Sequence, residues 1–172
     1  MAEIVELSHD EAAARLAELT DLLLDAVAGG ASINFLAELR PEDAESFWRA
    51  RLEAMPSGQT LIFAALEAGG VVGCVLLFPA WQPNQPHRAD VSKLLVHRSW
   101  RRLGLATQLM DAMEARALAL GRTLLTLDTS KGSGAEPLYS GRGYQRSGEI
   151  PGYALSTAGE PETAVFFYKA LA

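Results

Sequence analysis

The sequence predicts an α/β fold, a mixed and twisted sheet of about seven strands with flanking helices. Residues 60–66 and 71–78 are apolar runs of strand length, and Ala68-Gly69-Gly70 between them is typical of a tight antiparallel hairpin. Between residues 90 and 127, a short strand, a long helix and a second apolar strand follow one another. That order implies a central pair of parallel strands joined by a right-handed crossover.

Capping and turn residues place the other elements. Ser8, with an acid three residues later, forms a capping box that starts a helix, and Gly29-Gly30 ends it. Pro41 suits the first turn of a second helix, and Pro151-Gly152 helps to separate two closing strands. The elements expected in this way are a strand at residues 3–7, helices over 8–28 and 41–55, a strand at 123–127, a short helix over 136–140, and strands at 144–149 and 163–171.

Composition is that of a soluble globular protein. Of the 172 residues, 49% are hydrophobic and 21% are charged, which suits one domain over residues 1–172. The formal net charge of −6 argues against a general affinity for nucleic acid. The sequence contains no secretory leader pattern and no apolar run of membrane length, so we expect a cytoplasmic protein without a membrane partner.

Cysteine and histidine usage gives no sign of a metal or of redox chemistry. Cys74 is the only cysteine and lies in the apolar run G-C-V-L-L-F, so it is expected to be a buried small hydrophobe. An intrachain disulfide is excluded. His9, His87 and His97 are scattered, without metal-ligand spacing, and no metal is expected.

The helix inside the crossover has one apolar face and an unusual start. The first acid of this helix is Asp111, although helices usually carry acids in their first turn. Arg98, Arg101 and Arg102 precede it instead, together with Gly104, which lets backbone come close to a ligand. These features suit either a bound phosphate-bearing anion or a solvated basic turn. The residues expected on the buried face are Leu105, Leu109, Met113, Ala117 and Leu120.

Three stretches together resemble the GCN5-related N-acetyltransferase (GNAT) family. They are D-V-S-K-L-L-V from Asp90, the turn R-R-L-G-L-A from Arg101, and L-Y-S-G-R-G-Y from Leu138. Within that family the sequence is similar to the tabtoxin-resistance type of acetyltransferase, through G-G-A-S, L-L-T-L-D-T and G-E-I-P-G-Y. The resemblance covers essentially the whole chain and implies the GNAT fold, with the parallel strand pair at the cofactor site.

The resemblance also implies acetyl-CoA as cosubstrate and a set of residues that bind it. The pantetheine arm is expected to pair with strand backbone, and the pyrophosphate is expected to rest on turn amides. Carried onto this sequence, the strand residues are Leu94, Leu95 and Val96, and the turn residues are Arg101, Arg102, Leu103, Gly104, Leu105, Ala106 and Thr107.

Three residues are candidates for catalysis by the same resemblance. Tyr139 falls at the position of the general acid, and Asp90 and Asp128 are candidates for accepting the amine proton, directly or through a water. Each of the three has an alternative role: Tyr139 as a core aromatic of a short helix, Asp90 as an ion-pair partner of Arg88, and Asp128 as a cap for the loop after it. We expect the two carboxylates at opposite ends of the parallel pair, and Tyr144 as a core aromatic.

The function implied is acetyl transfer to the primary amine of a small molecule, such as an amino-acid-like compound, a toxin or an antibiotic. Its pocket is expected between residues 30–35, the Trp81 loop and Tyr153, with Glu149 or Asp90 pairing with a substrate ammonium. The alternatives are a protein or peptide N-acetyltransferase and a non-catalytic acyl-CoA-binding sensor. Dimers are common in such families, so a homodimer is one candidate assembly, but the sequence does not indicate the oligomeric state.

Overall fold

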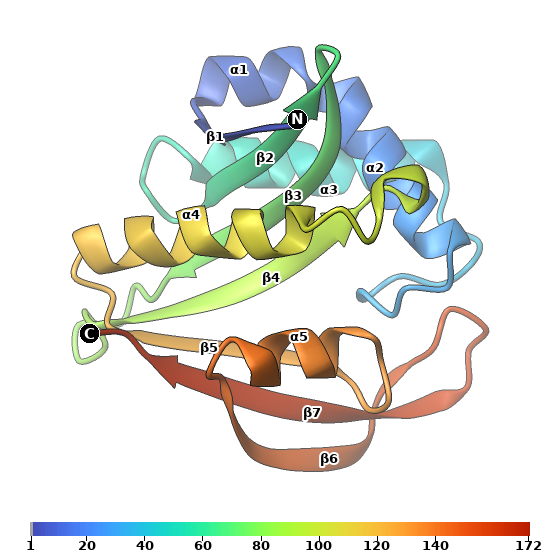
Figure 1. Ribbon diagram of the computed structural model, residues 1–172. Coiled ribbons are helices and arrows are strands. Elements are labelled where there is room, and N and C mark those ends of the chain that lie inside the picture. The colour runs from blue at the N-terminus through green and yellow to red at the C-terminus, as the bar shows by residue number, and fades with distance from the viewer. Residues whose placement is uncertain (1) are drawn as a thin grey trace.

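One mixed sheet runs through the molecule, with all neighbouring strands antiparallel except the pair β4–β5. The computed structural model describes residues 2–172 (Figure 1). The sheet confirms the predicted α/β class and the seven expected strands, in the order β1-β2-β3-β4-β5-β7-β6. The strands are β1 (Glu3–Leu7), β2 (Leu61–Glu67), β3 (Gly70–Pro79), β4 (Arg88–Val96), β5 (Leu124–Ser130), β6 (Gln145–Leu155) and β7 (Pro161–Ala170).

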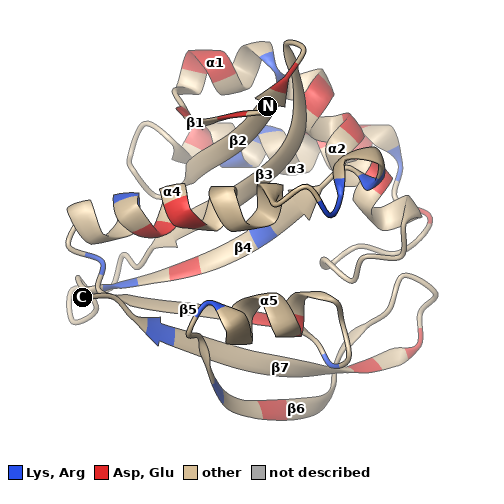
Figure 2. Ribbon diagram, in the orientation of Figure 1, with Lys and Arg blue, Asp and Glu red and all other residues tan. Residues whose placement is uncertain are grey.

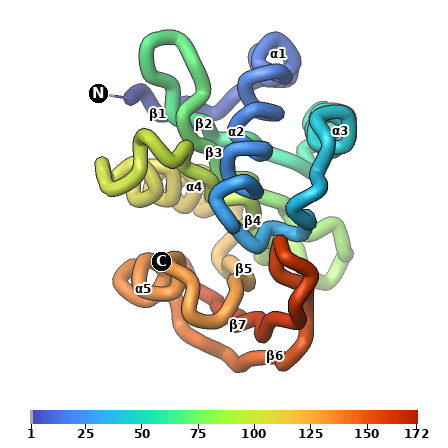
Figure 3. The backbone as a smooth tube through the Cα atoms, turned by 90° about the vertical axis from the view of Figure 1, so that its right-hand side faces the viewer, coloured from blue at the N-terminus to red at the C-terminus, as the bar shows by residue number. Residues whose placement is uncertain are grey.

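Helices cover both faces of the sheet and enclose two apolar cores. Figure 3 shows α2 and α3 on one side of the strands, with α4 and α5 on the other. One core joins α1, α2 and α3 to the sheet around Trp48, and the other joins α4 and α5 to it around Leu109 and Met113. Within residues 2–172, no helix is long and apolar enough to cross a bilayer. The helices are α1 (His9–Ala14), α2 (Leu16–Ala28), α3 (Pro41–Ala54), η1 (Arg98–Trp100, a 3-10 turn), α4 (Leu105–Ala119) and α5 (Ala135–Gly141).

The helix predicted over residues 8–28 is two helices that meet at Arg15. The capping box at Ser8 is present, so the predicted start is correct. Arg15 leaves the helical conformation, and its guanidinium donates to the carbonyl of Gly69 at 2.8 Å and to Glu18 at 3.1 Å. Because this anchor is a hairpin 54 residues away, no local pattern predicts the break.

Two predicted element ends are also wrong, for local reasons. Leu120 is 40% exposed because α4 ends at Ala119, whereas Leu105, Leu109, Met113 and Ala117 are buried as expected. Strand β6 runs on through Pro151-Gly152 instead of stopping there. A proline is tolerated because β6 is an edge strand, and its register with β7 shifts between Ile150 and Ala154.

The parallel pair β4–β5 is short and then opens. Pairing runs only from Arg88↔Leu124 to Asp90↔Thr126, although both strands continue for several residues beyond that point. Figure 1 shows the two strands diverging after this contact. The second half of β4 therefore has a free backbone edge on the side of β5, while its other edge stays paired with β3.

A bulge in β4 lies in the open region. Ser92 faces Leu76 and Leu95 faces Cys74, so β4 advances three residues while β3 advances two. Lys93 lies in this bulged segment, and its φ of 52° is in the left-handed region. Cys74 is fully buried beside the bulge, and its Sγ lies 3.5 Å from the Lys93 carbonyl oxygen. Burial raises the pKa of this thiol to about 12, which confirms Cys74 as an inert core residue.

Candidate active site

A pocket of about 650 Å³ opens where β4 and β5 diverge. Its walls come from α3, β3, β4, β5, β6 and β7, together with Asn34 from the loop before α3. Both predicted carboxylates, Asp90 and Asp128, line it. The two predicted carboxylates therefore gather at one cavity, whereas Tyr139 is not among the residues that line it.

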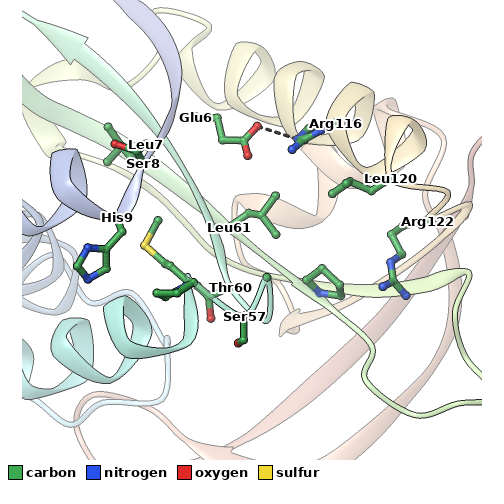
Figure 4. A pocket seen from close by; sticks show the side chains of 14 residues that line it. Glu6, Leu7, Ser8, His9, Ser57, Thr60, Leu61, Arg116, Leu120 and Arg122 are labelled. Atoms are coloured by element: carbon green, nitrogen blue, oxygen red, sulfur yellow. Dashed lines mark ion pairs between the residues drawn. The ribbon is translucent and has the colours of Figure 1, made fainter.

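A second pocket of similar size, about 660 Å³, lies elsewhere and contains none of the predicted site residues. Figure 4 shows it between the end of β1, the start of β2 and the last turns of α4. Glu6 and Arg116 pair across it at 2.9 Å. Because these charges satisfy each other, this pocket offers less to a ligand than the one between β4 and β5.

Asp90 and Asp128 lie together, so the expectation that they stand at opposite ends of the strands is wrong. Asp90 pairs with Thr126 in the register of β4–β5, and Asp128 follows Thr126 by two residues, on the same face of β5. The parallel contact covers only the first three residues of each strand, so Asp90 lies where the contact ends. The Asp90 charge in fact raises the pKa of Asp128, which requires them to be close.

The two carboxylates have different surroundings. Arg88 Nη1 donates to Asp90 Oδ1 at 2.5 Å, and the Thr126 hydroxyl donates to the same oxygen. The predicted ion pair between Arg88 and Asp90 is thus confirmed. Within residues 2–172 the Asp128 side chain forms no ion pair, and burial raises its pKa, an effect that nearby Lys93 opposes. Asp128 is therefore the carboxylate that is better placed to accept a proton near neutral pH.

Lys93 is a site residue that the sequence reasoning missed. It is 8% exposed, lines the pocket, and holds its Nζ 5.5 Å from the Phe47 ring centre and 5.8 Å from that of Phe35. Burial lowers its pKa to about 8, and Asp128 acts in the opposite direction. The sequence contains a hint of this burial, because Lys93 falls at the same alternate positions of the strand as the buried residues Val91 and Leu95.

The two neighbouring tyrosines face different charges. Tyr139, on α5, is 7% exposed and packs its ring 5.6 Å from Tyr144 and 5.9 Å from Phe167. Burial, followed by the charge of Asp128, raises the pKa of Tyr139 to about 12. Tyr144 instead lies under the Lys169 ammonium at 5.4 Å and is a core aromatic, as predicted. Of the two hydroxyls, that of Tyr139 is the one coupled to the pocket.

The turn before α4 has the free amides that the sequence predicted. Gly104 is the residue at the N-cap, with a φ of 78°, and neither a capping side chain nor an acid occupies the first turn. The amides of Leu105, Ala106 and Thr107 are therefore left for solvent or a ligand. Arg101, Arg102, Leu103 and Thr107 are exposed around them, while the Leu105 side chain is buried in the core.

One arginine of the turn is already engaged. Arg98 donates through its backbone N–H and through Nε to Asp25 of α2, at 3.0 and 2.8 Å. Contrary to the expectation from the sequence, it is therefore not free to bind an anion. Figure 2 shows the basic segments of the turn beside an α4 start that lacks acids. Upstream on β4, Leu94 and Val96 are half-buried beside the open edge, whereas the Leu95 side chain is buried.

The predicted pocket lining is correct in part. Of residues 30–35, Asn34 lines the pocket, and Trp81 lines a smaller adjoining hollow that shares Asp90 with it. Tyr153 does not line the pocket but packs 5.1 Å from Phe166, which does. Glu149 is paired with Lys131 at 3.0 Å and with Arg146, away from the pocket, so it does not fit the role of a substrate partner.

No candidate metal centre accompanies the pocket. Across residues 2–172, the side chains of His, Cys, Asp and Glu form no group of three that could hold a metal ion.

Replacing Lys93 by Met is expected to raise the pKa of Asp128 further. Burial and Asp90 raise that pKa, whereas Lys93 is the largest of the effects that lower it, so loss of the cation shifts the pKa upward. The carbon-13 chemical shift of the Asp128 carboxyl, followed against pH, measures the change. The control is the surface residue Asp43, whose pKa is lowered by Arg40 and should be the same in both proteins. An unchanged titration of Asp128 would show that Lys93 does not act on it.

Comparison with known proteins agrees with this geometry. An N-acetyltransferase from Staphylococcus aureus Mu50 has a TM-score of 0.81 at 17% identity, covering 100% of this chain and 99% of that one. The yncA protein of Salmonella typhimurium, whose structure holds its cofactor acetyl-CoA, has a TM-score of 0.79 at 17% identity, covering 100% and 95%. A ribosomal-protein-alanine N-acetyltransferase from Brucella melitensis has a TM-score of 0.78 at 19% identity, covering 98% and 99%.

These structures share the fold with this chain and leave the tabtoxin-resistance subgroup a prediction. The family itself rests on the sequence, because residues 20–144 match the model of the acetyltransferase (GNAT) family. That match spans most of the chain and includes the β4 strand, the turn at Gly104, and both Tyr139 and Asp128. The chain therefore belongs to the GNAT acetyltransferase family, which uses acetyl-CoA as its acyl donor.

Proposed function

We propose that this protein is an acetyl-CoA-dependent N-acetyltransferase that acts on the primary amine of a small molecule. One juxtaposition carries the proposal. An acid-free helix start and an open strand edge lie on the same β4–α4 unit, and that edge leads into a pocket that holds two carboxylates. The first two features suit an elongated anionic thioester, and the third suits a cationic acceptor.

The residues present fit the cosubstrate. Three unpaired amides at the start of α4 point along the helix axis, where the partial positive charge of the helix favours a pyrophosphate. Arg101 and Arg102 are exposed there and have no carboxylate partner within residues 2–172. The free edge of β4 near Leu94 offers backbone donors and acceptors to an amide-containing arm, as an edge strand does to an added strand, whereas the Val96 carbonyl already accepts from Arg101 Nε at 3.2 Å.

Asp128, in the pocket, and Tyr139, on α5, supply proton transfer for the reaction. A carbon–nitrogen bond forms and a carbon–sulfur bond breaks, so the amine must lose a proton and the leaving thiolate must gain one. Asp128, with its raised pKa, accepts the amine proton directly or through a water. Tyr139, with its pKa raised to about 12, stays protonated at neutral pH and donates to the thiolate. Asp90, held by Arg88 and Thr126, keeps negative charge beside them.

The walls of the pocket favour a small acceptor over a protein. Aromatic rings of Phe47, Phe78 and Phe166 line it, and the loop before α3 is tied over it to the β6–β7 turn, where the Ala37 amide donates to the Thr157 carbonyl at 2.8 Å. The resemblance of the sequence to tabtoxin-resistance acetyltransferases favours an amino-acid-like acceptor in the same way.

Release of free thiol from acetyl-CoA across a panel of small amines and peptides tests the function. We expect turnover with a small primary amine and much lower kcat/KM with peptides that carry the same terminal residue. Tight binding of acetyl-CoA without turnover on any acceptor would contradict the proposal and favour an acyl-CoA-binding sensor. Preference for peptides would favour a protein N-acetyltransferase.

Gly104→Val is expected to weaken binding of coenzyme A at least tenfold. Valine at a φ of 78° costs about 1–2 kcal/mol of backbone strain and turns the adjacent amides away from their common direction. Gly58→Val is the matched control, because Gly58 has a φ of 72° and open surroundings but lies away from the site. Calorimetric titration should show loss of affinity in the first variant only. Equal affinities in the two variants would rule out the turn as a phosphate site.

Tyr139→Phe is expected to lower kcat by about 100-fold, the usual contribution of a general acid, with little change in affinity for coenzyme A. Tyr144→Phe is the control, since it removes a hydroxyl from the same aromatic cluster on the side of Lys169. Steady-state kinetics and thermal unfolding of both variants separate chemistry from packing. If both variants retain the kcat of the unmodified enzyme, Tyr139 is not the acid.

A further inference from the structure

Arg51, on α3, presents an unpaired cation to the pocket. Its guanidinium carbon lies 4.8 Å from the Phe47 ring centre and 5.7 Å from that of Phe78, so two aromatic rings hold it. Its Nε is buried and has no hydrogen-bond partner, and no carboxylate within residues 2–172 forms an ion pair with it. A buried donor without an acceptor is costly, and such groups often await a ligand.

Other arginines in the chain show that this is unusual. Most of them form ion pairs, and on the same helix Arg49 pairs with Glu45 at 2.5 Å. Arg51 lies two residues further on, so it projects from a different side of α3, where it lines the pocket instead. Fixing a guanidinium between rings reduces its conformational freedom, which prepares it to bind a planar anion.

A second cation stands beside it. Lys93 Nζ lies 5.5 Å from the same Phe47 ring, and the Arg51 charge lowers the pKa of this lysine, as expected of like charges that face each other. Asp128 partly balances Lys93, and nothing comparable balances Arg51. The pocket therefore carries positive charge toward α3 and negative charge, from Asp90 and Asp128, toward β5.

We propose that Arg51 binds the carboxylate of the acceptor, so that the substrate is an amino acid whose amine faces Asp128. The inference rests on the proposed function and names its substrate class. A guanidinium binds a carboxylate through two parallel hydrogen bonds, which would satisfy the buried Nε. It would also place an anion between two cations that otherwise repel each other. The ammonium end of the same molecule then meets Asp90 and Asp128, and Asp128 takes its proton.

The first test compares acids with their amides. The twenty free L-amino acids and their α-carboxamides are assayed as acceptors with wild-type protein, Arg51→Met, Arg51→Lys and Arg49→Met. Methionine keeps the contact with both rings but removes the charge. For the best amino acid, we expect kcat/KM to exceed that of its amide by about 100-fold, and Arg51→Met to remove that preference.

The controls make this result specific. Arg51→Met should lower kcat/KM for the acid far more than for the amide, Arg51→Lys should keep part of the preference, and Arg49→Met should behave as wild type because Arg49 lies outside the pocket. The proposal is overturned if the amide is as good an acceptor as the acid, or if Arg51→Met keeps the preference.

A binding measurement separates this proposal from the proposed function. With coenzyme A present, the best-bound L-amino acid should raise the melting temperature of wild type and Arg49→Met, but not of Arg51→Met. If no amine is acetylated, the proposed function is wrong. The melting temperatures then still test whether Arg51 binds the carboxylate of an amino acid. A shift that Arg51→Met abolishes supports the site, and the absence of any shift in wild type overturns it.

Discussion

The short parallel contact between β4 and β5 is the constraint on which the site depends. Three residue pairs, ending at Asp90↔Thr126, hold the two halves of the sheet together before the strands diverge. Each half is otherwise stabilised by its own antiparallel ladders, β1 to β4 on one side and β5 to β7 on the other. Because the strands of each half are paired within that half, the second part of the β4 edge can stay without a pairing strand while the fold remains stable.

Polar contacts strengthen the point at which the strands separate. Arg88 Nη1 donates to both Asp90 and the Thr126 hydroxyl, and that hydroxyl donates to Asp90, so a charged network ties β4 to β5 at the last paired position. An ion pair that is also hydrogen-bonded loses much if either partner is removed. The bulge at Lys93 follows three residues after Asp90 on β4. Together, the network and the bulge mark the point beyond which β4 and β5 no longer pair and the pocket lies between them.

The pocket contains charges of both signs at partial burial, which folding alone would not favour. Desolvation shifts Lys93 and Asp128 toward their neutral forms, and their mutual attraction is the largest effect that opposes it. Perturbed groups that gather in one cavity are typical of functional sites. In the second large pocket the charges of Glu6 and Arg116 are instead paired on the surface, so electrostatics rather than size distinguishes the two cavities.

The sequence alone predicted the seven strands along the chain, the crossover between β4 and β5, most of the buried face of α4 and the acid-free start at Gly104, but not the place of β7 between β5 and β6. These features follow from periodicity and from the conformational needs of single residues, which are local. Tertiary structure alone decided that Asp90 and Asp128 meet, that Lys93 is buried between them and Phe47, and that Arg51 has no partner. Each of these features depends on the register between strands that are distant in the sequence, or on burial of a side chain by residues from other elements. The break at Arg15 has the same origin, because its anchor is a hairpin carbonyl rather than its own helix.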